Sequence, residues 1–153
     1  MHLYKANYLH LYRAALELSR SDREEMDRLE AGRDPINVLT ASSDDPTVMH
    51  ISDDAGNVLA VGGHSDRLIW FVHTERAIRL SPRDKLRMLR LLARHLIEIK
   101  REAAARSPHD YFHFTNIVSV DNKAHIKLLN FLGATWCEKP LYANGHEFKQ
   151  FFF

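Results

Sequence analysis

The longest periodic pattern in the sequence predicts an amphipathic helix that begins at Ser81 and has strand-like segments on both sides. Ser81 can cap this helix, Pro82 suits its first position, and Asp84 favours its positive end. Apolar residues recur along it at helical spacing, namely Leu86, Leu89, Leu92, Leu96 and Ile99. A long helix with one apolar face, set between strands, is typical of a sheet that carries helices on its faces.

The segments before this helix predict two helices followed by strands. Ser21 and Glu24 match a capping box for the second helix. The paired glycines Gly62 and Gly63 are expected to permit a tight turn between strands. The periodicity predicts helices over residues 4–19 and 21–30, an irregular or strand segment over 35–40, and strands over 47–52, 58–63 and 67–73.

The segments after the long helix predict a strand, a short helix and a terminal pair of strands. Asp121 or Asn122 caps the short helix and Gly133 stops it. Asn144-Gly145 is a strong signal for a two-residue hairpin turn. The predicted elements are a strand over 111–120, a helix over 124–132, and strands over 135–142 and 147–153.

This order of elements predicts an α+β domain with a mixed sheet and helices on its faces. A chain of 153 residues is long enough for one real hydrophobic core. No repeat, linker or low-complexity segment divides it, so residues 1–153 are expected to form a single domain. Phe148, Phe151 and Phe153 are expected to lie partly in that core, and an exposed aromatic end that docks on a partner is the alternative.

The composition is that of an ordinary globular protein. The formal net charge is +1, so the whole molecule has no general attraction for nucleic acid. Cys137 stands alone, which excludes an internal disulfide framework and makes a reducing compartment the default. Neither a membrane-spanning run nor the pattern of a signal peptide is present.

The stretch from Asn122 to Ala134 resembles a segment of the GCN5-related N-acetyltransferase (GNAT) family, in which a strand leads to an asparagine and then to a helix that ends in glycine. Asn122 matches the asparagine and Gly133 the glycine, while Ala134 replaces the usual aromatic residue. The resemblance implies a GNAT-like, mostly antiparallel sheet with helices on both faces.

A narrower resemblance is spread over several short blocks between about residues 35 and 153. The blocks Val58–Gly63, Trp70–Val72, Arg79–Ser81, His125-Ile126 and Phe131–Ala134 together look like the small internal virion protein family of T7-like short-tailed phages, the autographiviruses. This resemblance implies a protein of virion assembly whose partners are other phage structural proteins of the internal core and the portal region. It also implies a place in the host cytoplasm during assembly and in the virion interior.

The GNAT resemblance implies residues that would bind acyl-CoA if the chain were an enzyme. Arg76, Arg79 and Ser81 stand where that family carries a glycine-rich phosphate loop, and Asn122 stands at the cofactor asparagine. Because Arg79 replaces the first glycine, its side chain is expected to crowd the phosphate path, although its charge partly compensates. No cofactor is therefore expected, and acetyl-CoA is the cofactor only if the enzyme alternative holds.

Tyr142 is the candidate general acid of that alternative, and His73 lies in the region of a general base. A tyrosine packed on the sheet and a simply hydrogen-bonded histidine are the competing interpretations. His109 and His113 have the spacing of a helical zinc pair, but the pattern there is strand-like, so no metal site is expected. Cys137 is expected to be a small buried residue and not a nucleophile.

Arginines gather on the outward side of the long helix, within about 40° of Arg83 at 100° per residue. A solvated helix face explains them as well as a contact with packaged DNA does. The residues concerned are Arg83, Arg87, Arg90, Arg94 and Arg101.

Three functions remain open from the sequence. The first is a catalytically inactive GNAT-like protein that acts in virion assembly through protein or DNA contacts. The second is an acetyl-CoA-dependent N-acetyltransferase that acts on a host or phage amine. The third is a module that binds a small ligand or inhibits a host protein through the same cleft without turnover.

Overall fold

The computed structural model describes residues 1–110 and 113–153. Its strands are β1 (His2–Lys5), β2 (Met49–Ser52), β3 (Val58–Ser65), β4 (Leu68–His73), β5 (Thr115–Ser119), β6 (Thr135–Trp136), β7 (Leu141–Ala143) and β8 (His146–Phe152). Its helices are α1 (Tyr8–Leu16), α2 (Arg20–Leu29), α3 (Pro35–Thr40), α4 (Glu75–Ile78), α5 (Pro82–Arg106) and α6 (Lys123–Phe131).

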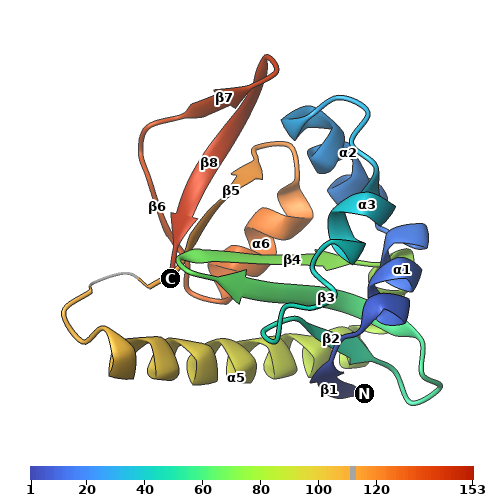
Figure 1. The fold of residues 1–153 in the computed structure, drawn as a ribbon. Coiled ribbons are helices and arrows are strands. Elements are labelled where there is room, and N and C mark those ends of the chain that lie inside the picture. Colours follow the sequence, from blue (N-terminus) through green and yellow to red (C-terminus); the bar gives the residue numbers. More distant parts are fainter. Residues whose placement is uncertain (111–112) are drawn as a thin grey trace.

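The eight strands of the described residues belong to one sheet, in the order β1-β2-β3-β4-β5-β8-β6 with β7 paired to β8. Every pairing is antiparallel except that of β4 with β5, which is parallel and joins only Leu68 to Thr115. The two strands meet at their first residues and then diverge, so the sheet has a V-shaped gap that widens toward His73 and Ser119 (Figure 1).

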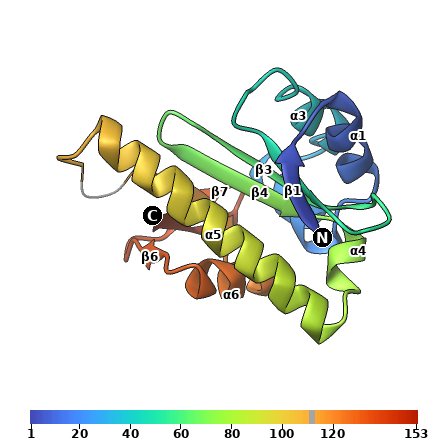
Figure 2. The same ribbon diagram turned by 90° about the horizontal axis from the view of Figure 1, so that it is seen from below.

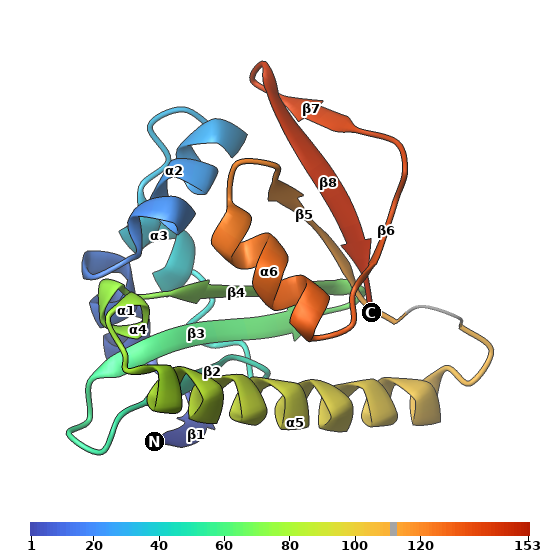
Figure 3. The same ribbon diagram turned by 180° about the vertical axis from the view of Figure 1, so that it is seen from behind.

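Helices cover both faces of the sheet, as expected. Figure 2 shows α5 and α6 on one face and α1 and α3 on the other, and Figure 3 shows α6 beside the V. Leu11, Leu39 and Val61 belong to the core under α1 and α3. Leu96, Leu129 and Phe151 belong to the core between the sheet, α5 and α6. The side chains of a strand alternate between the two faces, so the apolar residues of the central strands contribute to both cores.

The N-terminal third differs from its prediction in three places. Residues 2–5 form the edge strand β1, and α1 starts at Tyr8 behind the cap Asn7, not at residue 4. The cap of α2 is Ser19, whose hydroxyl accepts the N–H of Asp22, and not Ser21. Residues 35–40 are a short helix, because Asp34 caps it and Pro35 fits its first turn.

The expected turn at Gly62 and Gly63 is wrong, because both glycines lie inside β3. A Cβ atom on Gly62 would come within 2.6 Å of the Trp70 carbonyl oxygen and 2.7 Å of the Phe71 Cβ atom. Glycine is therefore required here for the close approach of β3 and β4 and not for a reversal of the chain.

The C-terminal strands agree more closely with their prediction. Asn144 and Gly145 both have positive φ and join β7 to β8 as a two-residue turn. Phe148, Phe151 and Phe153 are buried, so the core position of this end is confirmed. The predicted strand over residues 111–120 is observed as β5, and residues 111 and 112 lie outside the described residues.

Candidate functional site

The part of α2 from Asp22 to Glu25 spans the open end of the V. Asp22 Oδ2 accepts the backbone N–H of His73, the last residue of β4, at 2.8 Å. Glu25 Oε2, one helical turn later, accepts the backbone N–H of Ser119, the last residue of β5, at 3.2 Å. The two strands stop pairing with each other before this point. Carboxylates of α2 therefore accept the backbone N–H groups at the ends of both strands.

Asn122 joins these two carboxylates to α6. Its side-chain nitrogen donates to Asp22 Oδ1 at 3.1 Å and to Glu25 Oε2 at 2.9 Å. Its side-chain oxygen accepts the N–H of His125 at 3.1 Å and so caps α6. The side chain is 2% exposed. We refer to Asp22, Glu25 and Asn122, with the backbone donors of His73 and Ser119, as the crossbar.

The later turns of α2 extend these contacts. Arg28 donates to the Ser119 hydroxyl at 3.1 Å and lies 3.5 Å from the Asp121 carboxylate. The side chain of Asn144, in the β7–β8 turn, donates to the carbonyl of Leu29 at 2.8 Å. Polar contacts therefore hold α2 to β5, to the start of α6 and to the hairpin.

Burial and charge divide the ionisable groups of the crossbar. Burial opposes ionisation of Asp22, but its hydrogen bond to His73 and the nearby histidine charge outweigh this and hold its pKa well below the usual range. Burial, with the adjacent charge of Asp22, raises the pKa of Glu25 to about 7 in spite of its hydrogen bond with Asn122. At neutral pH Asp22 is thus charged and Glu25 is close to its midpoint.

His125 lies against the crossbar on the side of α6. Burial lowers its pKa to about 4, so its imidazole is neutral at pH 7. Its ring packs on Phe71 with centroids 4.5 Å apart and is 6.3 Å from the ring of His73. Among the described residues, neither ring nitrogen of His125 has a hydrogen-bond partner.

A cavity of about 370 Å³ lies between β4 and β5 behind the crossbar. Asp22, Glu25 and His125 line one part of it. The remaining wall is mostly apolar and includes Met26, Leu29, Val38, Leu39, Trp70, Phe71, Val72 and Ile117.

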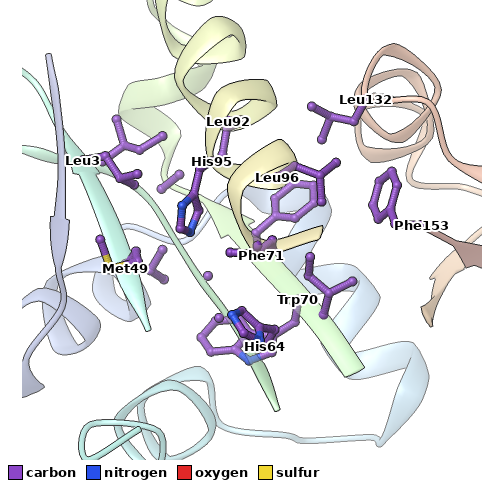
Figure 4. A pocket seen from close by; sticks show the side chains of 17 residues that line it. Leu3, Met49, His64, Trp70, Phe71, Leu92, His95, Leu96, Leu132 and Phe153 are labelled. Atoms are coloured by element: carbon purple, nitrogen blue, oxygen red, sulfur yellow. The ribbon is translucent and has the colours of Figure 1, made fainter. Parts of the chain in front are cut away.

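A second, smaller cavity of about 70 Å³ lies between α5 and the sheet (Figure 4). Leu92, Leu96 and Phe71 surround it, with His64 and His95 as its polar neighbours. It is small and its lining is mostly apolar, so it does not have the directed polar groups of a binding site.

The residues assigned to the phosphate loop by resemblance have partners within the chain. Arg76 forms an ion pair with Glu17, in which the Arg76 Nη2 to Glu17 Oε1 distance is 2.9 Å. Ser81 caps α5 by accepting the N–H of Asp84 and donates to the Asp84 carboxylate at 2.7 Å. Arg79 is exposed.

The start of α5 therefore carries an aspartate carboxylate where a pyrophosphate would need free backbone donors. Asn122, the fourth residue of the assignment, lies apart from this loop and has both of its amide hydrogens directed to carboxylates. The residues that are present fit an acyl-CoA pyrophosphate poorly.

Tyr142 lies on β7, opposite Glu147 in the ladder, and is 68% exposed. It belongs to the hairpin and does not line the cavity between β4 and β5. His73, in contrast, is at the open end of the V, where its Nδ1 is 3.5 Å from Asp22. The structure thus brings together His73 and Asn122 and leaves Tyr142 outside.

Other candidate positions stand apart from the crossbar. Cys137 is half-buried and carries no disulfide. Within residues 1–110 and 113–153, no three His, Cys, Asp or Glu side chains gather in a way that could hold a metal ion. No helix of the described part of the chain is both long and apolar enough to cross a membrane.

The outer face of α5 carries the predicted arginine stripe in exposed positions. Eight lysines and arginines and three acidic residues lie in α5, a net charge of +5. Since the whole chain has a net charge of +1, the other residues together carry −4. Positive charge is therefore concentrated on one helix.

One family model matches this chain. It is described as "Bacteriophage T7, probable scaffold protein Gp13" and matches residues 47–139. The matched part runs from just before β2 to just after β6, includes α5 and α6, and covers more than half of the 153 residues.

The chain belongs to this bacteriophage family. The resemblance of its short sequence blocks to a T7-like phage protein is thereby confirmed. A search of curated proteins gives no match.

Solved structures show the fold of this Gp13-family chain. An acetyltransferase of the GNAT family from Bacillus cereus ATCC 10987 has a TM-score of 0.60 at 12% identity, over 99% of this chain and 95% of that one. An N-acetyltransferase from Staphylococcus aureus Mu50 has a TM-score of 0.57 at 10% identity, over 100% of both chains. A mutant of the spermidine N-acetyltransferase SpeG from Vibrio cholerae has a TM-score of 0.59 at 14% identity, over 100% of this chain and 94% of that one.

The expected GNAT-like α+β fold is therefore confirmed. Identities this low establish the fold alone, because one fold supports many functions.

Sequence reasoning missed most of the crossbar. The sequence indicates that Asn122 caps a helix, but it does not indicate that Asn122 binds α2. Asp22 and Glu25 were not singled out, because their partners lie 100 and 97 positions away in the sequence. Their spacing by three residues on a charged helix was the available signal, since it places both carboxylates on one side.

Proposed function

We propose that this Gp13-family chain is a phage virion assembly protein that uses a GNAT fold for contacts with other phage structural proteins and catalyses no acyl transfer. The observation that carries the proposal is the crossbar. Asn122, which the fold resemblance assigns to the cofactor, has both amide hydrogens committed to Asp22 and Glu25. The open end of the V is closed by the protein itself.

The phosphate loop supports the same proposal. The Ser81 hydroxyl is shared with Asp84, and Arg76 is paired with Glu17. A bound pyrophosphate would have to compete with the Asp84 carboxylate at the start of α5, and like charges repel there. No acyl-CoA cofactor is required by the proposed role.

The partners that we propose are proteins of the internal core and the portal region, met in the host cytoplasm during assembly and in the virion interior. Family membership supports this choice, because the family is described as a probable scaffold protein of a phage.

Reconstitution tests the proposed role directly. The purified chain is mixed with internal core proteins and with portal protein of a T7-like phage, and the mixtures are run on size-exclusion chromatography with light scattering. We expect a complex of defined mass with at least one of them. Separate elution from all of them at tens of micromolar would contradict an assembly role through these partners.

We propose packaged DNA as a further partner, bound through Arg83, Arg87, Arg90 and Arg94. The net charge of +5 on α5 supports this, because contact with phosphate groups is mainly electrostatic. Fluorescence anisotropy with a 20-base-pair duplex at 50 and 200 mM salt tests it. We expect binding that weakens at least tenfold with salt, and that R83Q/R90Q/R94Q abolishes at 50 mM salt.

The matched control for this variant is R13Q/K139Q/K149Q, which removes the same charge at exposed positions away from α5. Equal loss of binding in both variants would indicate a general charge effect and would contradict a site on α5.

The second candidate function is an N-acetyltransferase, and the GNAT neighbours are the observation in its favour. It requires acetyl-CoA to displace the internal partners of Ser81 and Asn122. Tyr142 would have to reach the cleft from its exposed position on β7.

A further inference from the structure

Helix α2 is held over the V mainly by polar contacts. Its buried residues are Asp22 and Met26, so apolar burial contributes little to its attachment. Asp22 binds the end of β4, Glu25 binds the end of β5, and Arg28 binds the Ser119 hydroxyl. A helix attached in this way depends on the ionisation of its attachment points far more than a helix attached by leucines does.

The same helix forms one wall of the cavity between β4 and β5. Asp22, Glu25, Met26 and Leu29 line that cavity together with strand residues such as Trp70. Displacing α2 would therefore expose the apolar wall of the V, whereas keeping it in place shields that wall.

Two carboxylates of α2 contact the same amide nitrogen of Asn122. Asn122 can donate to both, but it carries no charge to offset two negative ones. When Glu25 is protonated the cluster has one negative charge from its carboxylates, and when Glu25 is ionised it has two in a buried place.

The other charged or titratable groups around Glu25 come from every neighbouring element. His125 Nδ1 of α6 is 4.0 Å from Glu25, and His73 of β4 faces Asp22 at 3.5 Å. Arg28 of α2 is a permanent cation that acts on Glu25, and it also lies 3.5 Å from the carboxylate of Asp121 in the β5–α6 turn. This cation is therefore already partly neutralised.

We propose that α2 is a lid on the cleft between β4 and β5, closed while Glu25 is protonated and released when Glu25 is ionised. The release removes the bonds of Glu25 to the Ser119 N–H and to Asn122, and it separates α2 from the end of β5. The apolar wall with Trp70 and Val72 then becomes accessible to solvent.

The buried position of Glu25 supports a neutral switching range, because burial raises its pKa to about 7. Glu25 binds its proton more tightly in the closed state than in solvent, where a glutamate has a pKa of about 4.3. The closed state is therefore favoured below pH 7 and loses stability as the pH rises through 7.

Hydrogen exchange of the His73 and Ser119 amides, followed by NMR at pH 6, 7 and 8, tests the lid. Both amides donate to the crossbar carboxylates, so their protection reports its closure. After correction for intrinsic rates, we expect the protection of Ser119 to fall on the order of tenfold from pH 6 to pH 8, since each pH unit above the pKa changes the protonated fraction about tenfold. Amides in the middle of α5, such as Leu96, should keep theirs.

The variant Glu25→Gln mimics the protonated side chain and should hold the protection of Ser119 constant from pH 6 to pH 8. His73 is retained in this variant, so the difference from the wild type isolates Glu25. Glu24→Gln, on the neighbouring half-buried position that pairs with Arg20, is the matched control and should behave as the wild type does.

The proposal is overturned if the wild type loses no more protection at Ser119 than at Leu96 between pH 6 and pH 8. It is equally overturned if Glu25→Gln follows the wild type. Should Glu25→Gln not fold, the comparison of Ser119 with Leu96 in the wild type still decides the question.

Discussion

The side chain of Asn122 joins α6 to α2. Its carbonyl oxygen caps α6 and its two amide hydrogens reach Asp22 and Glu25 on α2. A buried amide with three such bonds cannot be replaced by an apolar group without leaving partners unsatisfied.

Replacing Asn122 by Ala should lower the free energy of unfolding by about 2–4 kcal/mol, because a helix cap and two bonds to buried carboxylates are lost together. Urea unfolding followed by circular dichroism measures this. Asn37→Ala, at an exposed position on α3, is the control and should change stability by less than about 0.5 kcal/mol. Equal effects of the two substitutions would contradict the role of Asn122.

His125 should make the protein sensitive to mild acid. Its pKa is about 4 in the folded protein and about 6.5 in an unfolded chain. Between these values the unfolded chain binds more protons, so stability is lost as the pH falls from 6.5 toward 4. The contribution is about 3 kcal/mol for a shift of this size, because each pKa unit corresponds to about 1.4 kcal/mol.

His125→Phe keeps a ring against Phe71 and removes this titration. The loss of stability between pH 7 and pH 4.5, measured by urea unfolding, should therefore be smaller in the variant than in the wild type. His146→Phe, at an exposed position on β8, should leave the loss unchanged. A variant that follows the wild type at both pH values would show that His125 does not carry the effect.

Among the elements, the β7–β8 hairpin lies at an edge of the sheet and also contacts the end of α2. Asn144 adopts a φ of 49° and donates to the carbonyls of Arg28 and Leu29. These two properties can be separated by substitution.

Asn144→Gly adopts the positive φ without strain and loses only the side-chain bonds. Asn144→Ala loses the same bonds and is also strained at a positive φ. We expect losses of about 1 kcal/mol for Gly and about 2 kcal/mol for Ala in thermal or urea unfolding. If the Asn144→Gly protein were as stable as the wild type, the bonds from Asn144 to the end of α2 would not contribute to stability.

Gly62 in β3 has no room for a side chain. A methyl group there would meet Phe71 and the Trp70 carbonyl at less than 3 Å. Gly62→Ala should therefore destabilise the protein by about 1–3 kcal/mol in urea unfolding. Ser65→Ala, at the exposed end of the same strand, is the control. A Gly62→Ala protein with wild-type stability would contradict the close approach of the two strands.

The elements that the sequence predicted well are those with local signals. Ser81, Pro82 and Asp84 define the start of α5, and Asn144-Gly145 defines a hairpin, because each feature depends on residues next to one another. The strand β1 was missed, since four residues at a sheet edge have a weak pattern and are fixed by pairing with β2. The contacts of Asp22 with His73 and Asn122 depend on the tertiary fold, because these partners lie 51 and 100 positions away in the sequence.

For the whole molecule, the family is described as a probable scaffold protein of a phage, whereas the solved structures with the same fold include acetyltransferases. The chain belongs to a phage scaffold family, and its eight-stranded sheet has the GNAT arrangement. The GNAT resemblance could be found from Asn122 and Gly133 in the sequence. The closure of the V by α2 could not, because it depends on side chains from α2, β4, β5 and α6 meeting in space.

We propose that side chains of this protein close the place that acyl-CoA would take in its fold. Isothermal titration calorimetry of the purified chain with acetyl-CoA and with CoA at pH 6, where Glu25 is protonated and α2 is in place, tests this closure. We expect no heat of binding with either ligand at millimolar concentration. Binding in the micromolar range, about −8 kcal/mol, would contradict it and would make acyl transfer the function to pursue.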